Sequence, residues 1–386
     1  MADQRWVIVG GGIIGVHLAA RLVGEAKVEP DAITLVDPAS SLLARWRACT
    51  ANTGMRFLRS PAVHHLDVDP FGLLQWAGKR ADRRGRGLFA PPYDRPSLAL
   101  FNAHADMVIE RYGLAARHVQ DRVVAIRPRG DGVDLDLAAS GTLRAARVIL
   151  AVGASEAPEW PAWAVGLGAR VQHVFGDGVA VEEEPGHTVV IGGGISASQV
   201  AVRLAEAGHP TTVLARHAPR EHQFDADPGW LGPRHMAAFD ADRCEIRRRQ
   251  FIQRARHRGS VPPDVLRAVE RARASGRLVW RVGEVVDARP GDRELALETT
   301  AGALRADRVL LGTGFQRGRP GGALVDALVT EHGLPCAACG FPRVDATLRW
   351  HPRVMVSGPL AELELGPVAR NISGGRRAAD RILAAA

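Results

Sequence analysis

Lysine is nearly absent from this sequence. Of its 50 basic side chains only Lys27 and Lys79 are lysines, and the remainder are arginines. Schiff-base enzymes and phosphate-loop nucleotidases both depend on a lysine at a defined place. Because there is almost no candidate residue for that role, these two classes of enzyme are excluded.

Cysteine is also scarce, with four residues spread unevenly along 386 positions. This number is too small for a disulfide framework in a chain of this length, which indicates a reducing compartment. Cys336 and Cys339 have the spacing of a redox pair, but the second CxxC pair of a structural zinc site is absent. No metal site is expected, and a redox role for the pair is left open.

Long apolar runs are missing as well. No stretch approaches the roughly 20 uninterrupted apolar residues of a membrane helix, so we expect a soluble, cytoplasmic protein. The formal charge is +8 and the pI about 10.2, but the arginines are scattered through every segment, which argues against a nucleic-acid partner. The hydrophobic content of 46% is ample for two or three domains. The sequence does not decide between a monomer and a homo-oligomer.

The chain opens with a strand, a glycine turn, a helix and a second strand. Apolar residues 7–9 lead into Gly10, Gly12 and Gly15, and the second strand ends at Asp37. Glycines at this spacing allow a tight turn and let a pyrophosphate approach the N-terminus of the helix. Asp37 stands where an acidic side chain accepts hydrogen bonds from a ribose diol. The alternative is a plain glycine turn followed by a surface aspartate.

The same unit occurs a second time from Thr188 onward. Its turn contains Gly192 and Gly194, with Ala197 in place of the third glycine, a substitution that the fingerprint allows. At the end of its second strand Arg216 replaces the acidic residue, and a cation there suits the 2′-phosphate of NADPH. An exposed arginine in an arginine-rich chain is the plainer alternative.

Two nucleotide sites in one chain imply two nucleotides. The economical pairing is a resident FAD that takes hydride from a visiting NADPH. Because Asp37 would sit poorly beside a 2′-phosphate, we assign FAD to the first site and NADPH to the second.

The whole pattern predicts an α/β protein with two Rossmann-like, three-layer dinucleotide-binding domains. A helix is expected to begin at Ser97, a small antiparallel ribbon over residues 119–137, and one strand over residues 278–286. We expect the NADPH-binding domain to be inserted into the FAD-binding domain. The expected boundaries are 1–157 for the first FAD-binding segment, 158–308 for the NADPH-binding domain and 309–386 for the second FAD-binding segment.

In these features the chain resembles the flavoprotein monooxygenases that have two dinucleotide folds, and more narrowly their amine N-hydroxylase branch. The resemblance covers nearly the whole length at the level of architecture. Besides the paired glycine turns it depends on Gly153 with the following Ala-Ser, on the Gly-Thr-Gly-Phe run around Gly314, and above all on residues 55–61 followed by Asp-Pro-Phe at 69–71.

The resemblance implies roles for several residues. In that branch a basic residue on the 55–61 segment faces the reacting flavin, and Arg59 occupies this position, although lysine is the usual residue there. Arg56 is the second catalytic candidate. Trp46 resembles an aromatic residue beside the isoalloxazine, and Gly366-Pro367 resembles the start of a helix directed at the flavin. The expected cofactor-binding residues are Gly10, Gly12, Gly15, Asp37, Trp46, Met55, Gly153, Gly192, Gly194, Arg216, Gly314, Gly366 and Pro367.

The resemblance also implies that a histidine and an aromatic residue before the second fold help to seat the two domains. His173 and Phe175 occupy these positions, although the full fingerprint around them is not matched. The substrate pocket is expected where residues 50–100 and 225–260 meet the cleft between the domains.

The implied function is NADPH-dependent monooxygenation. Hydride reduces FAD, oxygen adds to the reduced ring, and the flavin hydroperoxide delivers one oxygen atom to a small nucleophile such as an amine. The expected partners are thus a small-molecule substrate and molecular oxygen. One alternative is a reductase that passes electrons to a disulfide, a quinone or an iron–sulfur partner, supported only by Cys336 and Cys339. Another is a nucleotide-binding regulatory protein without catalysis.

Overall fold

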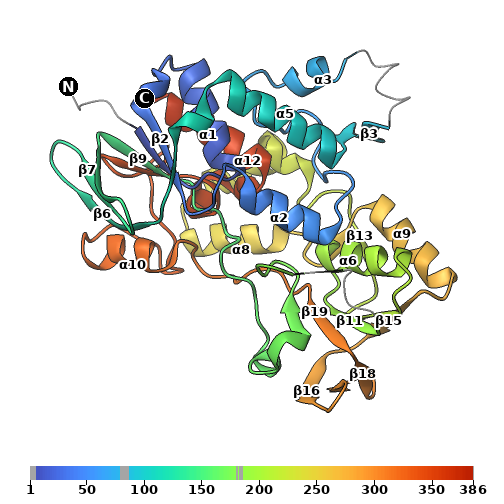
Figure 1. Cartoon of the computed structure of the whole chain (residues 1–386). Helices are drawn as coiled ribbons and strands as arrows, with labels where there is room; N and C mark the ends of the chain where they lie inside the picture. The colour runs from blue at the N-terminus through green and yellow to red at the C-terminus, as the bar shows by residue number, and fades with distance from the viewer. Residues whose placement is uncertain (1–5, 79–86, 180, 182–185, 386) are drawn as a thin grey trace.

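Two parallel sheets organise the chain. The computed structural model describes residues 6–78, 87–179, 181 and 186–385, and the two sheets lie in separate parts of the molecule (Figure 1). This arrangement confirms the expected α/β class with two Rossmann-type units. Within the described residues no helix is long and apolar enough to cross a membrane.

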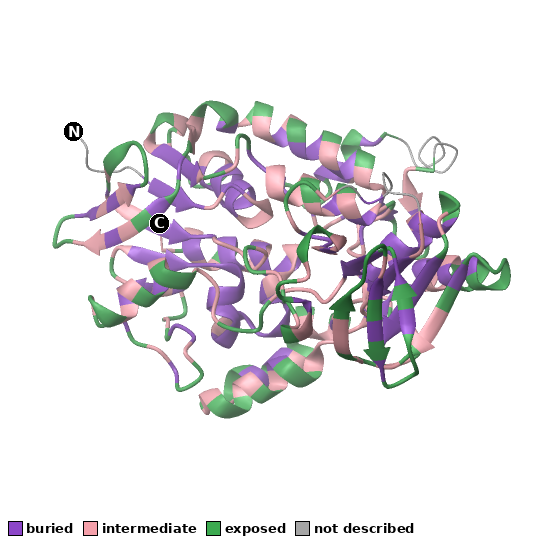
Figure 2. Ribbon diagram, turned by 60° about the horizontal axis from the view of Figure 1, so that its bottom comes forward, coloured by how far each residue is buried: buried purple, intermediate pink, exposed green. Residues whose placement is uncertain are grey.

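The first sheet joins the two ends of the chain. Its strand order is β20-β21-β9-β1-β2-β5, parallel throughout except for β20, which runs antiparallel to β21. Its central strands are short apolar runs buried on both faces, as parallel strands covered by helices are (Figure 2). The strands are β1 (Trp6–Val9), β2 (Ile33–Asp37), β5 (His118–Gln120), β9 (Arg147–Leu150), β20 (Arg349–His351) and β21 (Val354–Val356).

The second sheet repeats this plan. Its order is β10-β19-β11-β12-β15, and every neighbouring pair is parallel. Its strands are β10 (Val171–His173), β11 (Thr188–Ile191), β12 (Thr211–Ala215), β15 (Leu278–Val282) and β19 (Arg308–Leu311). The strand β19 pairs with β10 and β11, so the second sheet extends to Leu311, beyond the boundary expected at 308.

Each unit also has an antiparallel ribbon of three strands. The ribbon expected over 119–137 begins later, because residues 118–120 form β5 and pair parallel with β2. It also has a third strand and comprises β6 (Val123–Pro128), β7 (Val133–Leu137) and β8 (Gly141–Ala145). Its counterpart comprises β16 (Val285–Pro290), β17 (Leu295–Thr299) and β18 (Leu304–Ala306). The single strand expected over 278–286 is therefore wrong, because the chain leaves the parallel sheet at Gly283, whose N–H donates to the carbonyl of Ala215.

Helices connect the two ends of the chain and the two units. The helix α1 (Ile13–Gly24) packs against α12 (Ile372–Leu383), and α2 (Ala44–Thr53) of the first unit lies against α6 (Ile195–Glu206) of the second. The helix α5 (Leu98–Arg111) begins after Ser97 as expected, and the Ser97 hydroxyl accepts a hydrogen bond from the N–H of Leu100.

Two helices from the middle of the chain cover the C-terminal segment. They are α7 (Pro233–Ala241) and α8 (Glu245–Ala255). Their buried residues Met236, Phe239 and Ile252 form one apolar cluster with Phe341 and Leu363. Residues inside the expected NADPH-binding range thus pack directly on the second FAD-binding segment.

The helix expected to start at Gly366-Pro367 begins later. Pro367–Arg370 form one 3₁₀ turn, and α12 starts only after Asn371, which is extended at φ −97° and ψ 167°. A Cβ on Gly374 would lie 2.1 Å from the carbonyl oxygen of Val368, so the turn packs tightly against the helix that follows it.

Candidate dinucleotide and active site

The first glycine turn has the geometry of a phosphate cradle. Gly10 has φ 115°, and a Cβ there would lie 2.5 Å from the carbonyl oxygen of Ala151. A Cβ on Gly15 would lie 1.9 Å from the carbonyl oxygen of Gly10, whereas the space beside Gly12 is open. Gly12 caps α1 without a side-chain hydrogen bond, so the first N–H groups of the helix are free for an anion. These residues fit the pyrophosphate of a dinucleotide.

Asp37 lies beside this turn at the end of β2. Its carboxylate accepts hydrogen bonds from the backbone N–H of Gly11 at 2.7 Å and of Ala39 at 2.9 Å. A carboxylate has further lone pairs for ribose hydroxyls, so this placement suits the role expected from the sequence.

Three other expected FAD contacts lie around the first unit. The indole Nε1 of Trp46 donates to Asn102 Oδ1 at 3.1 Å, and its ring lies 5.6 Å from that of Phe101. Met55 packs against the first core, and Gly153 follows β9 with φ 68° and open space around it. Trp46 and Met55 are thus anchored by the protein itself, and Gly153 leaves room for a ligand.

The second turn is built in the same way. Gly192 has φ 134°, and a Cβ there would lie 2.4 Å from the carbonyl oxygen of Gly312. Gly194 caps α6 without a side-chain hydrogen bond. Ala197 stands in place of the third glycine, and its methyl group fits because residue 312 is a glycine. A Cβ on Gly312 would lie 2.6 Å from the Cβ of Ala197. This turn also fits a pyrophosphate.

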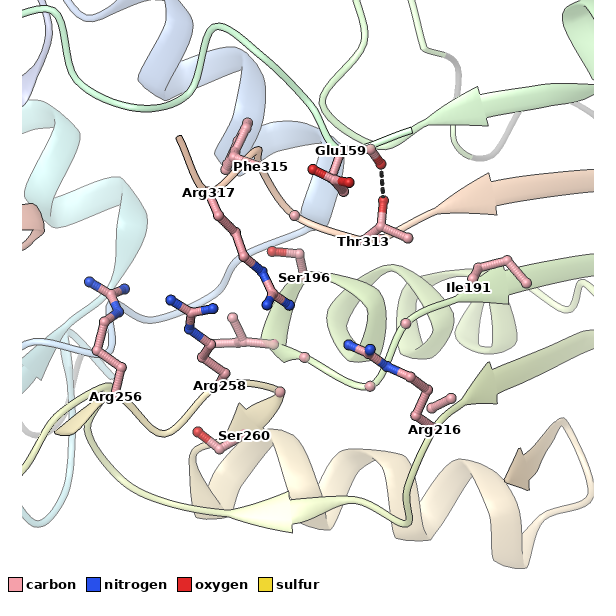
Figure 3. A pocket seen from close by; sticks show the side chains of 18 of the residues that line it. Glu159, Ile191, Ser196, Arg216, Arg256, Arg258, Ser260, Thr313, Phe315 and Arg317 are labelled. Atoms are coloured by element: carbon pink, nitrogen blue, oxygen red, sulfur yellow. Dashed lines mark hydrogen bonds between the residues drawn. The ribbon is translucent and has the colours of Figure 1, made fainter. Parts of the chain in front are cut away.

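A cleft of about 870 Å³ opens on the second turn (Figure 3). Arg216 and Gly314, both expected from the sequence, line it. It is rich in arginine, and its lining includes residues from both stretches expected to form the pocket. The residues that line it include Arg59, Glu159, Gly192, Gly194, Ser196, Arg216, His217, Asp225, Arg249, Arg256, His257, Arg258, Ser260, Glu284, Gly314, Phe315, Arg317, Glu362 and Arg370.

The C-terminal segment links the two turns. Glycines 358 and 375 on this segment both lie against Ile14 in the first turn of α1, where an added Cβ would come within 2.9 Å and 3.0 Å of its side chain. Glu362 and Arg370, between those glycines, line the cleft of the second turn. The two expected nucleotide sites therefore both border this one segment of chain.

A buried ion cluster lies at this junction. Glu362 is only 1% exposed, and its carboxylate accepts hydrogen bonds from Arg249 of α8 and from Arg370 Nε at 2.8 Å. Arg249 also lies over the ring of Phe341. Sequence reasoning missed this cluster, because nothing in the run Glu-Leu-Glu-Leu before Gly366 signals that one of its two carboxylates is buried.

The two expected catalytic arginines lie in different surroundings. Arg59 lines the cleft, but its guanidinium is bound by the carbonyls of residues 222–224, at 2.6 to 3.0 Å, and by Ser260 Oγ at 2.9 Å. Burial lowers the pKa of Arg59 below its usual value. Arg56 lies at the surface, paired with Glu206 of α6, and is not part of the cleft lining. The structure does not bring the two guanidinium groups together.

His173 joins the end of β10 to the residues that follow β19. Its Nδ1 accepts from the N–H of Phe175 at 3.1 Å, so in the neutral ring Nε2 donates to Thr313 Oγ1, also at 3.1 Å. Burial lowers the pKa of His173 to about 4. Phe175 stacks on Phe315 at 4.6 Å between ring centroids. These contacts suit the seating role that the resemblance implied.

Cys336 and Cys339 are not among the residues that line this cleft. Both are free thiols. Cys336 Sγ accepts a hydrogen bond from Arg319 at 3.4 Å, and burial raises the pKa of its thiol. A raised pKa disfavours the thiolate that a redox pair needs.

Comparison with known proteins identifies the family. The family model for pyridine nucleotide-disulphide oxidoreductases matches residues 102–373. The chain belongs to this family. An FAD-NAD(P)-binding model matches residues 7–155, which include the first glycine turn and Asp37. No curated protein sequence matches the chain.

Solved structures share the fold over the full length of this family member. The ornithine hydroxylase of Pseudomonas aeruginosa is 16% identical with a TM-score of 0.78, covering 99% of this chain and 98% of its own. The ornithine N-hydroxylase of Kutzneria sp. 744, solved with reduced FAD, NADP⁺ and L-ornithine, is 19% identical with the same TM-score and the same coverage. The bacillithiol disulfide reductase of Bacillus cereus is 18% identical with a TM-score of 0.64, again covering 99% and 98%.

These matches confirm the resemblance stated from the sequence, the α/β fold and the enzyme class. The protein is a flavin-dependent oxidoreductase, and its cofactors are FAD and a nicotinamide dinucleotide, NAD(P).

Proposed function

We propose that this protein is an NADPH-consuming monooxygenase that hydroxylates a small amine at nitrogen. The proposal rests on one observation: the second glycine turn opens on a cleft that ends at the segment lying against the first turn. Whole-length likeness to two ornithine N-hydroxylases supports the amine as substrate. When bound, FAD would supply the redox chemistry by accepting hydride and activating oxygen.

The protein's own residues bind and position the reactants. Gly10, Gly12 and Asp37 would hold FAD, and Gly192, Gly194 and Arg216 would hold NADPH. Helices α7 and α8 cover the C-terminal segment and would limit access of water to the junction.

The expected catalytic arginines are reassigned within this proposal. Because the hydrogen bonds of Arg59 go to backbone carbonyls and to Ser260, we assign Arg59 to positioning the 222–224 loop. Arg56 is assigned to the contact between α2 and α6 through Glu206. We also propose that the NADPH-binding domain ends at Leu311 and that the second FAD-binding segment begins after it.

The test is product formation by the purified, FAD-loaded protein. We expect NADPH consumption in air to yield hydroxylamine product with at least one ω-amino acid or aliphatic diamine. An anaerobic reaction should reduce the flavin without product. If no amine or sulfide gives an oxygenated product while NADPH still reduces the flavin, monooxygenation is wrong and a plain oxidoreductase remains.

The second candidate is a reductase for a disulfide or another electron carrier. The bacillithiol disulfide reductase fold supports it, but neither Cys336 nor Cys339 lines the cleft. Replacing both residues by serine separates the candidates. A monooxygenase should keep its turnover within about two-fold, because neither cysteine lines the cleft. Loss of turnover with a disulfide substrate would establish the reductase.

A further inference from the structure

Two arginines in the cleft lack acidic partners. Across residues 6–78, 87–179, 181 and 186–385, the guanidinium groups of Arg258 and Arg317 take part in no hydrogen bond or ion pair. The other arginines of the cleft are engaged. Arg256 pairs with Asp225 at 2.6 Å, and Arg59, Arg249 and Arg370 are bound as described above.

The two arginines reach the second glycine turn from opposite sides. Arg258 precedes Gly259, whose Cα lies 3.7 Å from the position of a Cβ on Gly194. Arg317 follows the run that begins at Gly312, whose carbonyl oxygen packs against Gly192. Figure 3 shows both side chains pointing toward one another near Ser196 in the first turn of α6.

An anion between the two guanidinium groups would stabilise this arrangement. Both side chains are exposed at the surface of the cleft. Like charges nevertheless repel, and partial burial together with the neighbouring Arg317 lowers the pKa of Arg258. The uncapped N-terminus of α6 adds positive potential at the same point. Two cations and a helix N-terminus match a group with two negative charges.

We propose that Arg258 and Arg317 form a two-sided clamp on the pyrophosphate of the nicotinamide nucleotide. The proposal rests on the proposed use of NADPH and extends it by separating two kinds of recognition. The clamp holds the part that NADPH and NADH share. Arg216 at the end of β12, with only a loose ion pair to Glu284 at 3.8 Å, reads the 2′-phosphate that NADH lacks.

The test is equilibrium binding of NADP⁺ and NAD⁺ to the FAD-loaded protein, measured by calorimetry for each variant. Arg258→Gln and Arg317→Gln should each weaken both nucleotides by roughly 10- to 100-fold and leave their ratio unchanged, since one charge-assisted contact is lost. Arg216→Gln should weaken NADP⁺ alone. Arg258→Lys keeps the charge and should restore most of the affinity.

Arg254→Gln is the matched control, because Arg254 is an exposed arginine of α8 that does not line the cleft. It should bind both nucleotides as the unchanged protein does. Equal thermal unfolding temperatures and FAD contents across the variants exclude a folding defect. If the Arg258 and Arg317 variants lose affinity for NADP⁺ only, or for neither nucleotide, the clamp is wrong. If the unchanged protein binds neither nucleotide, the proposed function itself fails.

Discussion

The two nucleotide-binding units have the same sheet plan but different surroundings. In the first unit the C-terminal segment lies against the first turn of α1, and Asp37 is fixed by two backbone N–H groups. In the second unit the turn opens on a cleft of about 870 Å³, and Arg216 is exposed. The same βαβ geometry can thus serve a nucleotide that stays and a nucleotide that comes and goes.

The difference between the two units lies beside the glycine turns and not in them. Both turns offer free helix N–H groups, so the phosphate cradle alone does not distinguish them. The two units differ in the C-terminal segment, which packs against Ile14 in the first turn of α1 and only borders the cleft at the second turn. Perturbing equivalent positions in the two units tests this comparison directly.

The largest effect is expected at the third position of the turn. In Gly15→Ala the new Cβ would meet a backbone carbonyl at 1.9 Å, so we expect a loss of roughly 3 kcal/mol in the free energy of unfolding and loss of bound FAD. The second unit already has Ala197 there, and Ala197→Gly should cost only about 1 kcal/mol. Urea unfolding and the flavin absorption spectrum measure both. Equal costs in the two units would contradict the comparison.

An intermediate effect on the free energy of unfolding is expected when the pH is lowered. Burial lowers the pKa of His17 to about 3 and of His64, His65 and His104 to about 4, all around the first unit. Beside the second unit burial lowers the pKa of His173 to about 4 and also lowers that of His257. Unfolding raises each pKa toward 6.5, so the unfolded chain binds more protons below that pH. The contribution of these histidines to the free energy of unfolding is therefore fully present above about pH 6.5 and is lost as the pH drops toward 4.

The measurement is urea unfolding between pH 7 and pH 4.5. Each such histidine contributes a slope of about 1.4 kcal/mol per pH unit within this window. His104→Gln should reduce the slope by that amount. At pH 5 the amides of α1 and α5 should lose protection from hydrogen exchange before those of α6. A flat stability profile below pH 6.5 would show that these histidines are charged in the folded protein.

Much of the fold was predictable because it depends on local patterns. The glycine spacing, the apolar strands and the residues ending them predicted both βαβ units, and Ser97 predicted the start of α5. The break at Gly283 was missed since a strand that changes sheet looks the same in sequence as one that continues. The late start of α12 was missed because Gly366-Pro367 is equally suited to a helix and to a 3₁₀ turn.

The site was predictable only where a motif defines it. The glycines, Asp37 and Arg216 lie at the turns and strand ends where the sequence put them, and their contacts with the nucleotides stay predictions. Arg258, Arg317 and the buried Glu362 were missed, because they lie on segments far apart in the chain that fold against one turn. In a chain with so many arginines, no local signal separates these two from the solvated ones.

The smallest expected effect on the free energy of unfolding concerns Asp37 at the end of β2 and Arg216 at the end of β12. Asp37 accepts two backbone hydrogen bonds, and Asp37→Asn leaves one carbonyl oxygen to accept them, so the free energy of unfolding should fall by about 1 kcal/mol even without FAD. Arg216→Gln should cause no measurable change, because the ion pair with Glu284 is long and exposed. Urea unfolding of the FAD-free protein compares the two. A larger loss for Arg216→Gln than for Asp37→Asn would mean that the open site, and not the enclosed one, is the better ordered in the absence of ligand.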